Sequence, residues 1–279
     1  MQKIPGKKIA DQILDDLKAE IRDKQLKPKL GVLLVGDDQA SHIYVSLKEK
    51  AAHDIGIQTD VRRLPNQISD DELIKIIKLW NADKNVHGIL IQMPLPEGHD
   101  ADRVIEAMDP KKDVDGFHPK HVADLYAGQA AILSPLHEGI LRLIAATPAE
   151  PNHALAIILA NSHTFADPLK YILEKASAEV EVMLSKDKDD KKLRQADIIV
   201  VAVGQLNFLT GNGVKPGACI IDVGINKTTD NKVRGDFDSQ SSENLDGWYS
   251  PVPGGVGPMT VALLMQNVVK VCRSQTSTL

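Results

Sequence analysis

Short apolar segments alternate with segments of helical periodicity in the first part of this chain, and this alternation restricts the fold more than any other feature. Three segments have the length and pattern of strands: 29–35, 59–64 and 88–92. Between them, helical spacing from Ser41 is stopped by Gly56, and Ser69 starts a second helix with the capping-box pattern Ser-x-x-Glu. Strands that alternate with helices predict a parallel sheet covered on both faces.

The same pattern returns later in the chain, after a proline-rich break at 148–152. Strands are expected at 154–159, 179–184, 197–203 and 218–223, and helices at 7–24, 138–146, 168–176, 190–196 and 259–272. A polar, proline-rich stretch at 109–121 links the two series. The sequence therefore predicts an α/β fold of two lobes with a cleft between them, and ligands beyond the carboxyl ends of the strands.

Composition excludes several classes of protein. The net charge is −5, both signs are spread along the chain, and aromatic residues make up 4%, so no surface for nucleic acid or an anionic membrane is expected. There is no signal-like N-terminal segment or long apolar run, which favours a cytoplasmic protein without membrane contact. Cys219 and Cys272 have no second Cys or His at ligand spacing and are expected to be buried, reduced thiols rather than zinc ligands.

Four features of the sequence carry side chains suited to chemistry at strand ends or at the crossing. Tyr44 and Lys48 are four residues apart and share a helix face. A lysine beside a phenol and an apolar wall can exchange a proton at neutral pH, although a surface lysine beside a half-buried tyrosine is the commoner arrangement. Gln92 ends a strand, Asp115 precedes a glycine in KDVDG, and 250–260 is a proline–glycine loop before a helix. Taken singly, each has an ordinary structural explanation.

Taken together, these elements resemble the bifunctional methylenetetrahydrofolate dehydrogenase/methenyltetrahydrofolate cyclohydrolase family. The matching stretches are VGDDQASHIYVSLKEKAAHDIGI, GILIQMPLP, KDVDGFHP, ADIIVVAVGQ, IIDVGIN and PVPGGVGPMTVALL. The resemblance implies a folate-binding lobe at 1–119, a three-layer α/β unit completed by the C-terminal helix at 258–279. It also implies a Rossmann-like, doubly wound cofactor lobe at 120–257. The implied reactions oxidise 5,10-methylenetetrahydrofolate and then hydrolyse the methenyl product to 10-formyltetrahydrofolate.

The resemblance also assigns roles to residues of the folate lobe. Lys48 would carry the proton of the water-addition step, since a neighbouring cationic intermediate favours the neutral amine. Tyr44 would stack on the ligand and orient Lys48, Gln92 would bond to Lys48, and Asp115 would accept pterin N–H groups. The backbone of Pro253, Gly254 and Gly255 would line the folate slot. Tetrahydrofolate derivatives and a second copy of the chain, in a homodimer, are the implied partners.

The cofactor lobe departs from the family pattern. The resemblance places the cofactor on Ala160, Asn161, Ser162, Ser185, Gly204 and Ile225. Ala160 and Ala166 replace the glycines of the usual turn, and Asn161 replaces an arginine that would clamp the 2′-phosphate of NADP. Leu184-Ser185-Lys186-Asp187 replaces a His-Ser-x-Thr pattern, and Ser134-Pro135-Leu136-His137 replaces a Pro-Cys-Thr-Pro segment. NADP is the cofactor that the family implies, and these departures leave NAD, or a weakened dehydrogenase, as alternatives.

Two other functions explain the sequence less well. An unrelated Rossmann dehydrogenase would not need KDVDG or PVPGGVGP, and the G-x-G-x-x-G fingerprint is missing from the 154–168 segment. A non-catalytic folate-binding protein would not need Lys48. The sequence therefore favours the bifunctional enzyme, with the folate side matching the family and the cofactor side altered.

Overall fold

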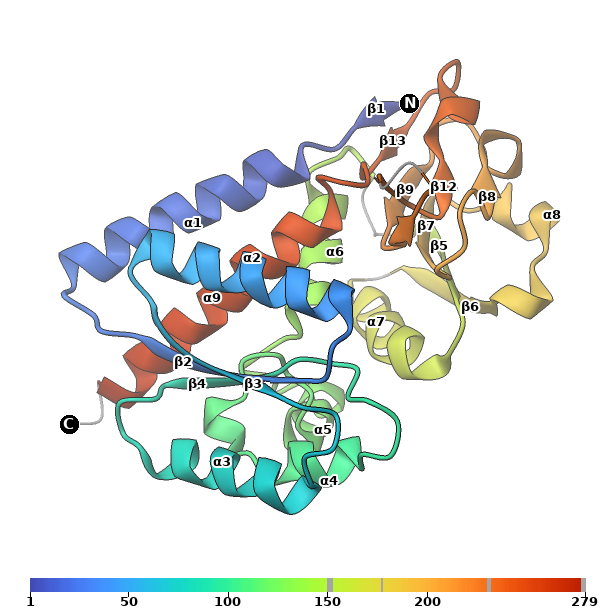
Figure 1. Ribbon diagram of the computed structural model, residues 1–279. Coiled ribbons are helices and arrows are strands. Elements are labelled where there is room, and N and C mark those ends of the chain that lie inside the picture. The colour runs from blue at the N-terminus through green and yellow to red at the C-terminus, as the bar shows by residue number, and fades with distance from the viewer. Residues whose placement is uncertain (150–152, 177, 230–231, 277–279) are drawn as a thin grey trace. The chain divides into compact units, whose positions relative to one another are not determined.

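The computed structural model describes residues 1–149, 153–176, 178–229 and 232–276 (Figure 1). The chain forms two compact units, one of Ala10–Pro135 with Val261–Leu279 and the other of Met1–Ile9 with Leu136–Thr260. Their boundaries differ from the predicted domain ranges 1–119 with 258–279 and 120–257. Those ranges, and the cleft expected between the lobes, stay predictions. We call the two units the folate unit and the cofactor unit, after the roles that the sequence predicts.

The folate unit contains a three-stranded parallel sheet in the order β3-β2-β4. Its strands are β2 (Lys29–Val35), β3 (Gln58–Leu64) and β4 (Gly88–Ile91), within one residue of the predicted bounds. Its helices are α1 (Gly6–Asp23, which begins in the other unit), α2 (Gln39–Ile55), α3 (Asp70–Ala82), α4 (Ala101–Glu106), α5 (Pro119–Tyr126) and most of α9 (Val256–Thr276). The expected strand–helix–strand–helix–strand order is confirmed.

Alternating side chains of the central strand β2 explain why both faces of this sheet are covered. Leu30, Val32 and Leu34 pack in a cluster with residues of α1, α2 and α9. Leu33 and Val35 point to the opposite face and pack with α3 and α4. Figure 1 shows α2 and α9 on one side of the sheet and α3 and α4 on the other. The unit is therefore the predicted three-layer α/β structure.

The cofactor unit contains a six-stranded sheet in the order β1-β13-β9-β7-β5-β6, whose paired strands all run parallel. The sheet strands are β1 (Gln2–Lys3), β5 (Leu155–Ala160), β6 (Glu179–Leu184), β7 (Ile198–Ala202), β9 (Cys219–Asp222) and β13 (Trp248–Tyr249). From β5 the chain passes first to β6 on one side and then to β7 on the other. This reversal is the switch point at which doubly wound sheets bind ligands, so the unit is Rossmann-like.

The remaining elements of the cofactor unit are short or helical. The helices are α6 (Pro135–Ala145), α7 (His163–Lys175) and α8 (Asp190–Leu193), and the small strands are β8 (Leu209–Thr210), β10 (Asn226–Lys227), β11 (Val233–Arg234) and β12 (Phe237–Asp238). Among the residues that the structure describes, single turns of 3₁₀ helix are η1 (Pro110–Lys112), η2 (Ser185–Asp187), η3 (Gly211–Gly213) and η4 (Ser239–Ser242).

Three predicted helix starts were wrong, and the first is that of α6, which begins at Pro135 rather than at 138. Helix α7 begins at His163, not at 168, so most of the expected cofactor turn is helical and Pro168 lies inside the helix. A proline removes a single N–H there, and the apolar face of Ala166, Leu169 and Leu173 still packs. Helix α9 begins at Val256, inside the loop predicted for 250–260. Pro258 falls in the first turn, where N–H groups lack helical partners in any case.

Cys219 and Cys272 are free and buried, as predicted. Within the described ranges, no group of three or more His, Cys, Asp or Glu side chains is placed to hold a metal ion. None of the described helices is long and apolar enough to cross a membrane.

Candidate active site

Helix α2 carries Tyr44 and Lys48 in the folate unit. The helix starts where the Asp38 carboxylate accepts the Ser41 N–H (2.7 Å) and ends at Gly56, whose φ of 94° is left-handed. Lys48 lies on the buried face of α2 and is 8% exposed. A lysine so deeply placed needs a polar partner for its Nζ.

Gln92 is that partner. The Lys48 Nζ donates to Gln92 Oε1 over 3.0 Å, and the Gln92 Nε2 donates to the Met93 carbonyl over 2.7 Å. The Gln92 N–H donates to the Leu33 carbonyl (2.8 Å) and so fixes Gln92 at the end of β4. Because an amide has one accepting and one donating end, the Met93 carbonyl forces the oxygen toward Lys48. The predicted hydrogen bond between Lys48 and Gln92 is present.

The loop that carries Asp115 is organised by Asp113, which sequence reasoning did not single out. Asp113 is fully buried. Its Oδ1 accepts the N–H groups of Asp115 and Gly116 (both 2.9 Å), and its Oδ2 accepts that of His118 (2.8 Å). The signal available in the sequence was the Asp-x-Asp-Gly spacing, since aspartates often bond to the backbone two residues on. Gly116 has a φ of 74°, which allows the turn.

Two further side chains hold this loop in place. Lys112 is buried, and its Nζ donates to the carbonyls of Trp80 and Asp83 (2.7 Å each) at the C-terminus of α3. A cation suits the negative end of a helix. Asn267 of α9 donates to the Val114 carbonyl over 3.0 Å. Sequence reasoning missed both residues, because their contacts lie far along the chain.

Asp115 has an unusual electrostatic environment. Burial raises the pKa of its carboxyl to about 6, the nearby Asp113 charge adds to the rise, and the Lys48 charge opposes it. Burial also raises the pKa of the Tyr44 phenol. Of these two groups, Asp115 lies within the field of Lys48. The folate unit therefore carries the Lys48 amine, its Gln92 partner and a phenol, together with a carboxyl group, Asp115, that can exchange a proton near neutral pH.

The proline–glycine loop belongs to the cofactor unit. Lys7 donates its backbone N–H to the Gly254 carbonyl (2.8 Å), and Gly254 has a φ of 108°. A Cβ on Gly255 would lie 2.7 Å from the Pro251 carbonyl oxygen, so a larger residue would not fit without a shift. The loop is ordered by these contacts, and the predicted role of Pro253, Gly254 and Gly255 at the folate remains a prediction.

The predicted cofactor residues all lie at the carboxyl edge of the six-stranded sheet. Ala160 ends β5 and Ser185 follows β6. Gly204 comes two residues after β7, and Ile225, about half exposed, comes after β9. Ser162 stands at the N-cap of α7 and makes no side-chain capping bond with the described part of the chain. This edge is where doubly wound sheets hold dinucleotides.

Asn161 bridges two of these strand ends at the switch point. Its Nδ2 donates to the Val203 carbonyl over 2.6 Å, and its Oδ1 accepts from the Ser185 Oγ over 2.7 Å. The side chain therefore joins the ends of β5, β6 and β7. Its amide nitrogen and its amide oxygen therefore each form a hydrogen bond to another residue of the chain.

Buried aspartates shape the rest of this edge. Asp236 Oδ2 accepts the N–H groups of Val203 (2.6 Å) and Gly204 (2.8 Å). Asp222 accepts those of Gly224, Asp236 and Phe237 (2.9–3.0 Å). Both carboxylates therefore fix the loops after β7 and β9.

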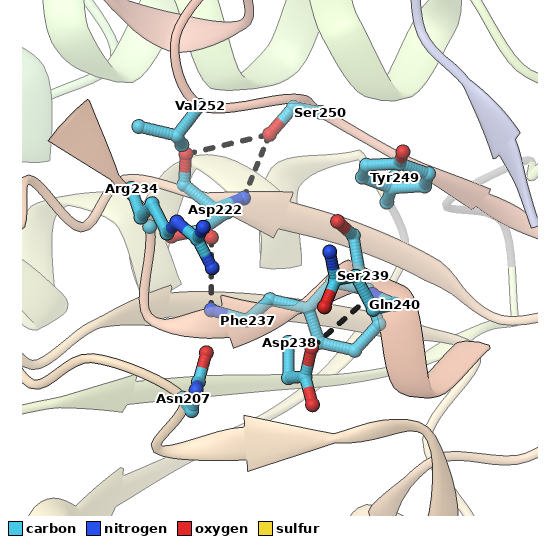
Figure 2. Close-up of a pocket in the computed structure, with 11 residues that line it drawn as sticks. Asn207, Asp222, Arg234, Phe237, Asp238, Ser239, Gln240, Tyr249, Ser250 and Val252 are labelled. Carbon is cyan, nitrogen blue, oxygen red and sulfur yellow. Dashed lines mark hydrogen bonds between the residues drawn. The ribbon is translucent and has the colours of Figure 1, made fainter. Parts of the chain in front are cut away.

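A cavity of about 170 Å³ lies beside Asp222 (Figure 2). It is lined by Asn207, Asp222, Arg234, Gly235, Phe237, Asp238, Ser239, Gln240, Tyr249, Ser250 and Val252. In Figure 2, Asp222 is bonded to Ser250 and Phe237, and Asp238 is bonded to Gln240. The Asp222 and Asp238 carboxylates in the lining of this cavity therefore accept backbone N–H groups of the surrounding loop.

Comparisons with known proteins agree with this geometry. Residues 4–115 match the family model "Tetrahydrofolate dehydrogenase/cyclohydrolase, catalytic domain", and residues 135–276 match "Tetrahydrofolate dehydrogenase/cyclohydrolase, NAD(P)-binding domain". The chain is 43% identical over 272 residues to the bifunctional protein FolD of an Exiguobacterium species, covering 96% of this chain and 97% of the relative.

Solved structures are similar over the whole chain. The bifunctional methylenetetrahydrofolate dehydrogenase/cyclohydrolase of Campylobacter jejuni is 38% identical with a TM-score of 0.93, covering 98% of this chain and 99% of that one. The Trypanosoma brucei enzyme, solved with NADP cofactor and an inhibitor, is 27% identical with a TM-score of 0.93 and covers 98% of each chain.

Proposed function

The chain belongs to the tetrahydrofolate dehydrogenase/cyclohydrolase family, and on this premise we propose that Lys48 is the proton carrier of its cyclohydrolase step. The chain is an enzyme of one-carbon metabolism with two activities. It oxidises 5,10-methylenetetrahydrofolate to 5,10-methenyltetrahydrofolate with a nicotinamide dinucleotide, and it hydrolyses the methenyl compound to 10-formyltetrahydrofolate. The observation that supports Lys48 is its buried amine, held by Gln92 and in the field of Asp115.

The hydrolysis needs one group that can both take and return a proton. Water attacks the methenyl carbon and loses one proton. The bond from that carbon to N5 then breaks, N5 takes a proton, and the new hydroxyl releases its remaining proton to solvent as it becomes the formyl carbonyl. A neutral Lys48 amine would accept the first proton and return it as an ammonium. Gln92 fixes the amine, because its oxygen cannot turn away without losing the Met93 bond.

Asp115 and Tyr44 are proposed as substrate-binding residues of the same step. A carboxylate accepts two N–H donors of a pterin ring, and the Asp113 carboxylate fixes the backbone that carries Asp115. The Tyr44 ring is half-buried and offers a face for stacking. The folate-lining role of Pro253, Gly254 and Gly255 is proposed from the resemblance.

The cofactor unit fits a dinucleotide. An added Cβ on Gly204 would meet no atom within 4 Å, which leaves open space for a ligand close to the backbone. Asn161, Ser162, Ser185, Gly204 and Ile225 would hold the cofactor, with the pyrophosphate at the N-terminus of α7. When bound, the nicotinamide ring would accept the hydride, which needs placement rather than an acid or base. NADP is the cofactor that the family implies, and NAD is the alternative.

Replacement of Lys48 tests the central assignment. Hydrolysis of methenyltetrahydrofolate, followed by the loss of its ultraviolet absorbance, should fall by about 100-fold or more in Lys48→Ala, the size expected for a lost general acid–base group. Lys48→Arg keeps the charge but cannot release a proton and should be equally impaired. Lys50→Ala is the matched control, since Lys50 is an exposed residue of the same helix paired with Asp54. Unchanged hydrolysis in Lys48→Ala would show that another residue is the catalyst.

We also propose a cytoplasmic homodimer. The free, buried cysteines suit a reducing compartment. Leu206 and Val233 of the cofactor unit are exposed apolar side chains (44% and 39%) and would supply part of a subunit interface. Light scattering coupled to size exclusion would give the mass of a dimer, and a monomer mass would refute this part.

A further inference from the structure

On the premise of the proposed function, we propose that the cofactor unit selects NAD over NADP, because the pocket beside β6 offers hydrogen-bond acceptors to a free ribose hydroxyl. NAD and NADP differ only at the 2′ position of the adenosine ribose. There NAD carries a hydroxyl, which donates and accepts, and NADP carries a phosphate, which brings about −1.5 to −2 charges at neutral pH and mostly accepts. The polarity and charge of the side chains at this end of the sheet therefore decide between them.

The hydrogen bonds of Asn161 and Ser185 leave the oxygen of Ser185 as a hydrogen-bond acceptor at this end of the sheet. Ser185 has a single hydroxyl proton, and it is donated to the Asn161 Oδ1 over 2.7 Å. The Asn161 Nδ2 is turned to the Val203 carbonyl over 2.6 Å. What remains for a ligand is the set of lone pairs on Ser185 and the second N–H of the Asn161 amide, which suit a hydroxyl that both donates and accepts. A phosphate would meet one neutral donor from these two side chains and no cation.

The adjoining pocket is also rich in acceptors and carboxylates. It has a volume of about 320 Å³ and is lined by His163, Glu181, Val182, Met183, Leu184, Asp187, Asp189 and Lys192. The Lys192 ammonium is already paired with the Glu181 carboxylate (2.5 Å). Asp187 has no ion-pair partner among the residues that the structure describes. Of the lining carboxylates, Glu181 and Asp189 share the field of Lys192, and Asp187 is the one that no cation of the described lining neutralises.

A neutral His163 adds no positive charge to the lining of this pocket. Its Nδ1 lies 2.9 Å from the Asp167 Oδ1, so a neutral ring that donates there presents its other nitrogen as an acceptor. Carboxylates that follow the second strand of a doubly wound unit bond to the ribose 2′-hydroxyl of NAD. Here β6 is that second strand, and Asp187 follows it in η2. We assign Asp187 as the residue that determines the cofactor specificity of this chain.

Binding of the reduced cofactors tests the proposal without the reaction. Purified full-length protein is titrated with NADH and with NADPH, and nicotinamide fluorescence gives each dissociation constant. NADH should bind at least about 10-fold more tightly, as expected where an unneutralised carboxylate faces a 2′-phosphate. Asp187→Asn should tighten NADPH binding about 5-fold or more and should weaken or leave unchanged that of NADH. Glu179→Gln removes the same charge at the opposite end of β6 and should change neither constant more than about twofold.

Substitution of Lys186 tests the opposite explanation, that a cation at this end of the sheet holds the 2′-phosphate. It is an exposed cation next to Ser185 but is not part of the pocket lining. Lys186→Ala should affect NADH and NADPH equally. A selective loss of NADPH binding in this variant would mean that Lys186 clamps a phosphate, and the proposal would be wrong. Equal affinities for the two cofactors in the unaltered protein, or tighter NADPH binding, would overturn it as well.

The same preparations separate this proposal from the function on which it rests. If NADPH binds more tightly and both activities are present, the specificity assignment fails and the proposed function stands. If neither cofactor binds while methenyltetrahydrofolate is still hydrolysed, the dehydrogenase half of the function fails, and the specificity assignment fails with it. Circular dichroism of each variant identifies a protein that has not folded, and Asp187→Ser then replaces Asp187→Asn.

Discussion

Lys48 and Gln92 show how one backbone carbonyl can fix a catalytic amine. The Met93 carbonyl takes the Nε2 end of Gln92, and the remaining oxygen faces Lys48. The sequence predicted the pair because its residues stand at a strand end and on a helix face. It could not predict the Met93 contact, which depends on the backbone conformation after β4. The orientation of the amide, rather than its presence alone, is what the structure adds.

Asp115 makes the stability of the protein depend on pH. Its pKa is raised from 3.8 to about 6 by burial, so the folded protein binds this proton more tightly than the unfolded chain does. Its contribution to stability is therefore complete below about pH 4 and is lost as the pH rises through about 6. An ionised Asp115 at pH 8 costs about 1 to 3 kcal/mol of unfolding free energy, the upper value being the full shift and the lower allowing for partial solvent screening.

Asp115→Asn should consequently be more stable than the unaltered protein at pH 8, by about 1 to 3 kcal/mol, and no more stable at pH 4. Urea unfolding of both proteins at the two pH values measures this difference. The same variant should lose folate affinity, because an amide supplies one acceptor where the carboxylate supplies two. A stability gain of equal size at both pH values would mean that the charge of Asp115 is not its origin.

At the scale of elements, the loop from Lys112 to His118 is held by one buried carboxylate. Asp113→Asn replaces an acceptor oxygen by an NH₂ group, which must then face either the His118 N–H or those of Asp115 and Gly116. Leaving a buried donor unpaired costs about 1 to 3 kcal/mol. We expect this loss in urea unfolding, together with a raised KM for the folate, because Asp115 is carried by the same loop.

The matched control for Asp113 is Asp109→Asn. Asp109 accepts the Lys111 N–H as the N-cap of the preceding 3₁₀ turn, so it too bonds to the backbone of this region. Its carboxylate accepts one N–H where Asp113 accepts three. Its replacement should cost less than about 1 kcal/mol and leave KM unchanged. Equal losses in the two variants would mean that Asp113 has no special part in placing Asp115.

Long elements were predictable from the sequence and short ones were not. The strands β2, β4, β5 and β6 lie within one residue of their expected bounds, because continuous apolar runs of this length have few alternatives. The strands β1 and β13 are two residues long and join the sheet by pairing with distant chain segments, which leaves no periodic signal. Pro168 favours a helix boundary at 168, but α7 begins at His163 because the packing of its apolar face outweighs one missing hydrogen bond.

The residues of the candidate site also divide into those that the sequence predicted and those that it did not. Tyr44, Lys48, Gln92 and Asp115 were all named from the sequence, and the Lys48–Gln92 bond is present. Lys112, Asp113 and Asn267 were missed, because their side chains bond to the backbone of segments whose position only the fold determines. Residues that face a ligand leave a pattern in the sequence, whereas residues that bond to the backbone of a loop leave a weaker one.

At the scale of the whole molecule, the residues proposed for the two reactions lie on different units. Lys48, Gln92 and Asp115 belong to the folate unit, and Asn161 and Gly204 belong to the cofactor unit. Each unit has a hydrophobic core of its own. A substitution at the carboxyl edge of the cofactor sheet can therefore impair the hydride transfer and leave the hydrolysis largely intact.

Gly204→Val tests this separation in the direction opposite to Lys48→Ala. Gly204 has a φ of 70°, and a side chain there would fill the open space proposed for the cofactor while it strains the backbone. NADH binding and methylenetetrahydrofolate oxidation should fall by about 100-fold or more, because a blocked site loses placement of the hydride acceptor. Hydrolysis of added methenyltetrahydrofolate should stay within about twofold, since hydrolysis uses no group of this turn.

Both activities are assayed on one preparation. Gly217→Val controls for backbone strain, because Gly217 has a comparable φ of 87° and open space away from the carboxyl edge. A proportional loss of both activities in Gly204→Val, with the control active, would show that the two reactions depend on one shared structure.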